Sequence, residues 1–148
     1  MAQLCLQRGE GDRMSHPIMA LQESLVSGLG ADAGLVALTG ENGVFDAPPR
    51  GRKPPYVAID RHDVLARDGD LAPGHEHRVT LHVWAGSPDR AAALAIVERI
   101  LSVAFSADLG GETLRVTHRR QERTETAIDR ATGLARAVLV LRFFSEPR

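Results

Sequence analysis

The sequence predicts a single-domain α+β fold, with one mostly antiparallel sheet and two helices packed on one of its faces. Two segments carry apolar residues at helical spacing, and several shorter segments alternate apolar and polar residues as strands do. Most connections between these segments are short or hairpin-like, which favours antiparallel pairing. Together these features indicate a sheet covered by a helical layer.

The composition is that of an ordinary globular chain of 148 residues, 43% hydrophobic and 25% charged. The net charge of −1 gives no overall attraction for nucleic acid or for a membrane surface. A single cysteine, Cys5, excludes an internal disulfide and fits a reducing cytoplasm. No apolar run approaches the roughly 18 residues of a membrane helix, so we expect no membrane partner.

Residues 1–14 lack apolar periodicity and are predicted to form a flexible N-terminal extension to a domain spanning residues 15–148. The first helix is predicted over residues 16–29, with a short helical turn over 31–38. Apolar residues recur along one side of that helix: Ile18, Leu21, Leu25 and Leu29.

Two short strands are predicted next, at residues 44–45 and 56–59, joined by a proline-rich connector over 47–55. Residues 60–75 are polar and contain Gly and Pro, so we expect a long loop there. A loop of this length inside a compact domain is usually functional or mobile.

The segment from Glu76 to Ile100 predicts a strand followed at once by a helix. The strand places His77, Val79, Leu81 and Val83 on one face and Arg78, Thr80, His82 and Trp84 on the other. Ser87 is the expected helix cap and Pro88 suits the first turn of a helix that runs to about residue 107. Its apolar stripe comprises Ala93, Ile96, Val97, Ile100, Leu101 and Ala104.

The last two strands are predicted over residues 114–123 and 134–144, with a polar hairpin loop over 121–133 between them. Residues 137–141 are apolar on both faces, which indicates a central strand or one whose outer face meets another subunit. Trp84, Val138 and Val140 are therefore the candidate residues of a subunit interface.

The histidines and the acidic loop were tested as metal sites. His75 and His77 share a strand face, but His82 points the other way, and zinc needs three or four convergent ligands. The loop carries four carboxylates, but it lacks the spacing of an EF-hand; these are Asp60, Asp63, Asp68 and Asp70. With no G-x-S-x-G motif and no phosphate-binding loop, we predict no metal, no cofactor and no catalytic residue.

A basic cluster lies at the end of the fourth predicted strand, and its candidate rim residues are Arg115, Arg119, Arg120 and Arg123, with His118 among them. One interpretation is a solvated hairpin whose cations pair with Glu112, Glu122, Glu125 and Asp129. The other is a positive rim that faces DNA or an acidic neighbouring subunit.

The order of elements resembles the small tail-completion proteins of long-tailed bacteriophages, in particular the tail terminator of siphophage-like particles and gene transfer agents. The resemblance covers roughly residues 18–145. Four segments carry it. The first is the helix Ile18–Gly28 with Ala31-Asp32-Ala33-Gly34-Leu35 after it, and the second is Val44-Phe45-Asp46-Ala47-Pro48 leading to Pro55-Tyr56-Val57-Ala58-Ile59. The third is His77–Trp84 with the helix from Pro88, and the fourth is the closing strand Ala137–Phe144. The extension over residues 1–14 and the basic stretch His118–Arg123 depart from it.

The resemblance implies a non-enzymatic virion protein that forms a homo-hexameric ring at the head–tail junction. Such a ring ends tail-tube polymerisation, contacts the tail-tube protein on one side and a head-completion stopper or connector on the other, and lets DNA pass through its lumen. It is assembled in the bacterial cytoplasm. Two alternatives stay open: another neck, connector or tail-tube ring protein, and a small α+β enzyme or ligand-binding domain that uses His75, His77 and the acidic loop.

Overall fold

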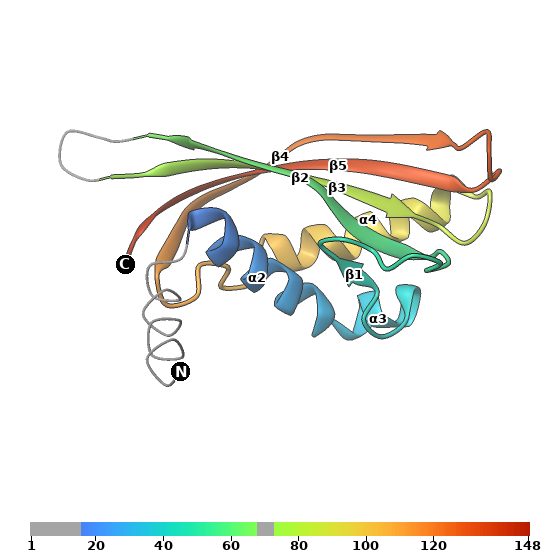
Figure 1. Cartoon of the computed structure of the whole chain (residues 1–148), viewed down its shortest axis with the longest axis horizontal. Helices are drawn as coiled ribbons and strands as arrows, with labels where there is room; N and C mark the ends of the chain where they lie inside the picture. Colours follow the sequence, from blue (N-terminus) through green and yellow to red (C-terminus); the bar gives the residue numbers. More distant parts are fainter. Residues whose placement is uncertain (1–15, 68–72) are drawn as a thin grey trace.

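The computed structural model describes residues 16–67 and 73–148, which form a five-stranded sheet and three helices (Figure 1). The strand order is β1-β2-β3-β5-β4, with β1 parallel to β2 and every other neighbouring pair antiparallel. The strands are β1 (Val44–Phe45), β2 (Tyr56–Ala66), β3 (His75–Trp84), β4 (Leu114–Ile128) and β5 (Ala135–Pro147); the helices are α2 (Pro17–Gly30), α3 (Ala33–Thr39) and α4 (Arg90–Ala104). The predicted α+β class and mostly antiparallel sheet are confirmed, whereas the expected count of two helices is one too low.

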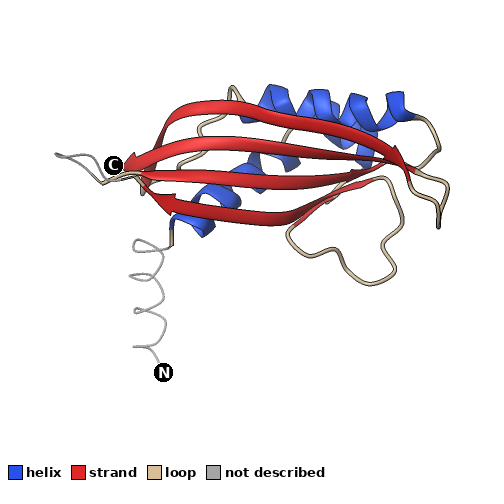
Figure 2. Ribbon diagram, turned by 90° about the horizontal axis from the view of Figure 1, so that it is seen from above, coloured by secondary structure: helices blue, strands red, loops and turns tan. Residues whose placement is uncertain are grey.

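All three helices lie on the same side of the sheet, as Figures 1 and 2 show from two directions. The core fills the space between the two layers, because apolar side chains of the helices meet those of the central strands. Its fully buried members include Leu21, Leu25, Leu29, Ile100, Val79, Leu81, Leu139, Leu141 and Phe143. Within the described residues, no helix has the length and apolar character needed to cross a membrane.

The alternation predicted for β3 is confirmed, since His77, Val79, Leu81 and Val83 are all fully buried. The central position of β5 is also confirmed, because it pairs with β3 along one side and with β4 along the other. A central strand needs apolar residues where its neighbours and the helical layer remove it from water, which explains the run over residues 137–141.

Two predicted loops were partly wrong, because strand pairing continues into them. Residues 60–66 belong to β2 and pair with β3, and residues 121–128 belong to β4 and pair with β5. The register shifts at 59/61 in β2, and at 116/118 and 121/123 in β4. A bulge inserts one residue and changes which side chains face the core, so the alternation expected of a strand is broken in both segments.

Helix α4 begins later and ends earlier than predicted. Asp89, not Ser87, caps it, since the Asp89 carboxylate accepts from the Ala91 N–H at 2.9 Å. The carbonyl of Ser87 instead accepts from the Ala135 N–H at 2.9 Å and ties the β3–α4 connection to β5. This tertiary hydrogen bond keeps Ser87 outside the helix.

An ion pair between Asp32 and Arg99 joins α3 to α4. Asp32 caps α3 by accepting from the Leu35 N–H at 2.9 Å, and its two oxygens accept from Arg99 at 3.0 and 2.7 Å. The hydrogen bond from Arg99, together with that from Leu35, lowers the pKa of the Asp32 carboxyl despite its partial burial. One side chain thereby fixes both a helix start and a helix–helix contact.

Replacing Gly110 with Ala should destabilise the fold. A methyl group at this buried position would overlap the backbone carbonyl of Leu114. Moving Leu114 away would break the hydrogen bond that its N–H donates to the Gly110 carbonyl and would disturb the start of β4. We expect a loss of about 1–3 kcal/mol in the free energy of unfolding, measured by urea denaturation. The control is Gly30→Ala, where the added methyl meets nothing within 4 Å. Equal stability of the two variants would contradict this account.

Candidate functional site

The sheet face turned away from the helices brings together the three residues predicted to form a subunit interface. On β5, Leu139 and Leu141 point into the core, so Val138 and Val140 point to the other face. Val138 lies opposite His82 and Val140 opposite Thr80, while Trp84 lies opposite Arg136 at the end of the same strand pair. We call this side of the sheet the open face.

Long charged side chains cover the apolar centre of the open face. Val140 is only 8% exposed, although none of the described helices lies over this face of the sheet. Ion pairs cross four strands here: Arg67–Glu76 at 3.0 Å, Arg142–Glu76 at 2.5 Å, Arg142–Glu122 at 3.3 Å and Arg78–Glu122 at 3.2 Å. Arg78 and Arg142 lie opposite each other, next to the Thr80–Val140 pair on this face, where the stems of arginine side chains can cover apolar surface.

Glu76 is the central acceptor of this network. Its side chain is 7% exposed, and it bridges Arg67 at the end of β2 to Arg142 on β5. Burial alone would raise the pKa of the Glu76 carboxyl, but the two arginines outweigh it, so the pKa is lowered. The carboxylate therefore stays charged and holds three neighbouring strands together electrostatically.

A groove of about 380 Å³ runs over the open face beside Val138 and Val140. Its walls carry charges of both signs, from Asp60, Asp63, Arg78, Glu122 and Arg123. At the end of this face the Arg136 guanidinium stacks over the Trp84 ring at 5.5 Å from its centroid. An apolar floor with polar walls is the pattern of protein–protein interfaces.

The four arginines of the predicted basic rim do not form one free cluster, because three of them already bind other groups of the chain. Arg115 pairs with Glu146, and Arg123 with Glu125 at 2.7 Å. Arg119 donates to the Ala104 carbonyl at 2.9 Å and so caps the end of α4. Within the described part of the chain only Arg120 of the four has no hydrogen-bonding or ionic partner.

Residues 60–66 of the predicted acidic loop belong to β2, and two of its carboxylates lie beside basic side chains. Asp63 accepts from Arg61 at 2.9 Å, and Asp60 lies 3.5 Å from His82. Asp68 and Asp70 lie outside the described residues, as do Cys5 and the extension over residues 1–14. Among the described residues, no group of three or more His, Cys, Asp or Glu side chains is arranged to hold a metal ion.

The histidines form a polar line through the helix-covered side of the sheet. His77 is fully buried; its Nδ1 lies 2.9 Å from His62 Nε2, and its Nε2 lies 2.9 Å from Ser145 Oγ. His75 lies beside this line, with its ring centroid 6.4 Å from that of His77. His82 lies on the open face instead, as predicted.

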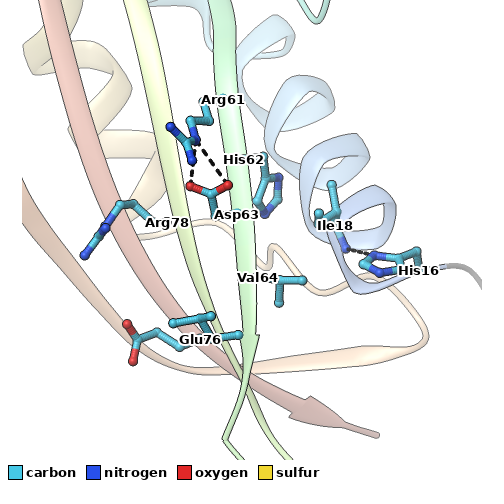
Figure 3. Close-up of a pocket in the computed structure, with 9 residues that line it drawn as sticks. His16, Ile18, Arg61, His62, Asp63, Val64, Glu76 and Arg78 are labelled. Atoms are coloured by element: carbon cyan, nitrogen blue, oxygen red, sulfur yellow. Dashed lines mark hydrogen bonds and ion pairs between the residues drawn. The ribbon is translucent and has the colours of Figure 1, made fainter.

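This line lies next to the N-terminal turn of α2. Figure 3 shows His62 and Val64 on the side of β2 towards His16 and Ile18, whereas Arg61 and Asp63 lie on the other side. A cavity of about 520 Å³ is bordered by residues of both sides. Burial is the main cause that lowers the pKa of His62 to about 4 and that of His77 to about 3, so both rings are neutral at pH 7.

The model of the tail completion protein gp17 family matches residues 23–146 of the sequence. The chain belongs to this family. Among solved structures, a chain from the virion of a native gene transfer agent (GTA) particle matches with a TM-score of 0.77 and 27% sequence identity, over 89% of this chain and 99% of that chain. No curated protein matches. The family and the virion match together identify a structural tail protein of a phage-like particle.

In this member of the tail-completion family, the sequence did not predict the contacts of His77 with His62 and Ser145. The three residues lie on β2, β3 and β5, and 15 and 68 positions separate the bonded pairs. The one available signal was the position of His77 on an otherwise apolar strand face. A histidine in such a place needs partners for both ring nitrogens.

His62 and His77 should make stability depend on pH. In the unfolded chain they bind protons near pH 6.5, and in the folded chain near pH 4 and pH 3. Between these values the unfolded state binds more protons, so stability is full above about pH 6.5 and falls as the pH falls. The expected slope is up to ~1.4 kcal/mol per pH unit for each histidine.

Urea denaturation between about pH 7 and about pH 4.5 measures this slope. In the variant His62→Gln, the slope of the free energy of unfolding against pH should fall by the contribution of one histidine. The control His82→Gln, on the opposite face, should keep the slope of the unmodified protein. Identical slopes in all three proteins would show that His62 does not carry the effect.

Proposed function

We propose that this structural tail protein is the tail terminator of a phage-like particle or gene transfer agent, a non-enzymatic protein that forms a homo-hexameric ring at the head–tail junction. The observation that carries the proposal is the family match over residues 23–146, supported by the match to a chain of a GTA virion. Such a ring ends tail-tube polymerisation and contacts the tail-tube protein on one side and the head-completion protein on the other.

The open face supplies a surface for neighbouring subunits. A closed ring needs a heterologous interface, in which one patch of a subunit meets a different patch of the next. Val138, Val140 and Trp84 provide an apolar centre, and the surrounding ion pairs provide a rim that selects a complementary surface.

DNA passes through the lumen of the proposed ring and must be able to move. Strong neutralisation of phosphates would hold the DNA in place and would make binding steeply dependent on salt. A chain with a net charge of −1 avoids a strong grip of this kind.

The alternative within assembly proteins is another neck or connector ring, or a tail-tube subunit. A tube subunit stacks on itself without limit, whereas a terminator forms one ring and stops. Filaments of the isolated protein would favour the tube subunit.

The enzyme alternative has less support, because His77 is fully buried and both of its ring nitrogens have partners.

A charge on the open face should block assembly without unfolding the subunit. Val138 is partly exposed, so Val138→Asp should change the free energy of unfolding by about 1 kcal/mol or less while abolishing ring formation. The matched control is its neighbour Leu139, which is fully buried under the helices. Leu139→Asp should unfold the subunit, because an unpaired carboxylate there costs several kcal/mol.

Size-exclusion chromatography with light scattering measures ring formation, and circular dichroism measures whether the subunit is folded. If the folded Val138→Asp protein forms hexamers, or if normal tailed particles carry it, Val138 does not belong to the interface. The proposed ring would then need another subunit surface.

The decisive test of the function is electron microscopy of particles from cells that lack this gene. Unjoined heads with absent or overgrown tails are expected. Joined, active particles of normal shape would reject the assignment to the head–tail junction.

A further inference from the structure

Three connections emerge together at one end of the sheet. Tyr56 pairs with Trp84, Trp84 with Arg136, and Arg136 with Ala127, so β2 and β5 begin where β3 and β4 end. Residues 46–55, 85–89 and 129–134 therefore lie at the same end, as both general views show (Figures 1 and 2). We call these connections, extended to Arg90 at the start of α4 and to Arg136 near the start of β5, the turn end.

Contacts between the connections confirm that they are neighbours. Ala85 N–H donates to the Ala135 carbonyl at 2.9 Å, which joins the second connection to the end of the third. A Cβ on Gly86 would lie 3.3 Å from Pro55 Cδ, so the first connection packs on the second. The turn end is one continuous surface.

This surface is basic, although the chain as a whole is slightly acidic. Residues 46–55, 85–90 and 129–136 hold six Arg or Lys and three Asp, against a net charge of −1 for the chain. Two of the carboxylates are engaged locally: Asp89 caps α4, and Asp129 accepts from Thr132 at 3.0 and 2.8 Å. The hydrogen bonds from Thr132 lower the pKa of the Asp129 carboxyl.

Four cations of the turn end are exposed and have no ionic or hydrogen-bonding side-chain partner among the described residues: Arg50, Lys53, Arg90 and Arg130. This distinguishes them from most of the β4 arginines, whose guanidinium groups already bind Glu146, Glu125 or the Ala104 carbonyl. Free cations gain most from an external anion, because no internal pair has to be broken.

The connection over residues 46–55 is held so that two of these cations project outward. Arg52 lies over the Phe45 ring at 5.3 Å from its centroid and donates to the Thr39 carbonyl at 3.2 Å. Its N–H closes a turn with the Pro49 carbonyl at 3.1 Å, in which Gly51 takes a positive φ of 85°. Arg50 lies at the tip of this turn, and Lys53 follows the anchor.

We propose that the turn end binds the phosphate backbone of double-stranded DNA, through Arg50, Lys53, Arg90 and Arg130, without reading the sequence. Exposed cations on anchored turns suit phosphate contacts, and the loss of chain entropy on binding is small where the loop is already ordered. The contact rests on the proposed function, in which DNA crosses the ring. Few cations per subunit keep the contact weak enough for DNA to move.

The test uses the purified full-length protein and a fluorescent 30-bp duplex of random sequence, about three helical turns, in anisotropy titrations at several salt concentrations. Each phosphate contact contributes about 0.9 to the slope of log K against log salt, so Arg50→Gln with Lys53→Gln should lower the slope by about 1.8 for each subunit of the ring that contacts the duplex. Between about 50 and about 200 mM salt, the unmodified protein should then lose about twelvefold more affinity than the variant for each such subunit.

The matched control is Arg115→Gln with Arg120→Gln, which removes the same charge from β4. An unchanged slope in this control, with rings still formed by both variants, is the expected result. A smaller slope only in the β4 variant would overturn the proposal in favour of the basic rim. Absence of DNA binding by the unmodified protein, with unjoined particles from the Arg50/Lys53 variant, would instead identify the turn end as a contact for an acidic protein.

Ring formation, and the shape of particles from cells that lack the gene, are measured in experiments that do not depend on DNA binding. Normal rings and unjoined heads in the absence of the gene, with no effect of Arg50 and Lys53 on DNA, would reject this inference and leave the proposed function standing.

Discussion

The position of β5 between β3 and β4 is the constraint on which the rest of the structure depends. Backbone hydrogen bonds fix β5 on both sides, so its side chains can point only towards the helices or away from them. Leu139, Leu141 and Phe143 then anchor the core, and Val138 and Val140 are left on the open face. One strand thus defines both the hydrophobic core and the open face.

The open face combines apolar residues with a layer of ion pairs. Glu76, Arg142 and Glu122 span neighbouring strands, and their side chains cover valines that no other layer protects. The Glu76 side chain is 7% exposed, so its ion pairs with Arg67 and Arg142 hold neighbouring segments together from a largely buried position. In the proposed ring, the charges around the apolar centre would select a partner and set its orientation.

The helix-covered side contains the less expected polar feature. His62, His77 and Ser145 form a line across three strands at the end of the core near α2. Burial keeps both imidazoles neutral. The hydrogen bonds of His77 to His62 and Ser145 offset its loss of contact with water, whereas His62 Nδ1 is buried with no partner among the described residues. The line links β2 to β3 and β5 where the apolar part of the core ends, on the opposite side of the sheet from the open face.

The sequence by itself determined the fold class, the main helices, the buried face of β3 and the central place of β5, because these depend on local periodicity and on a run of apolar residues. It also pointed to Trp84, Val138 and Val140, whose position on one face follows from strand alternation and register. Only the tertiary structure decided the lengths of β2 and β4, since bulges at 59/61 and 121/123 interrupt the alternation that a sequence pattern needs. The partners of His77, the distribution of the β4 arginines and the basic turn end likewise depend on segments far apart in the chain. Pairing between strands, and not local preference, brings those segments together.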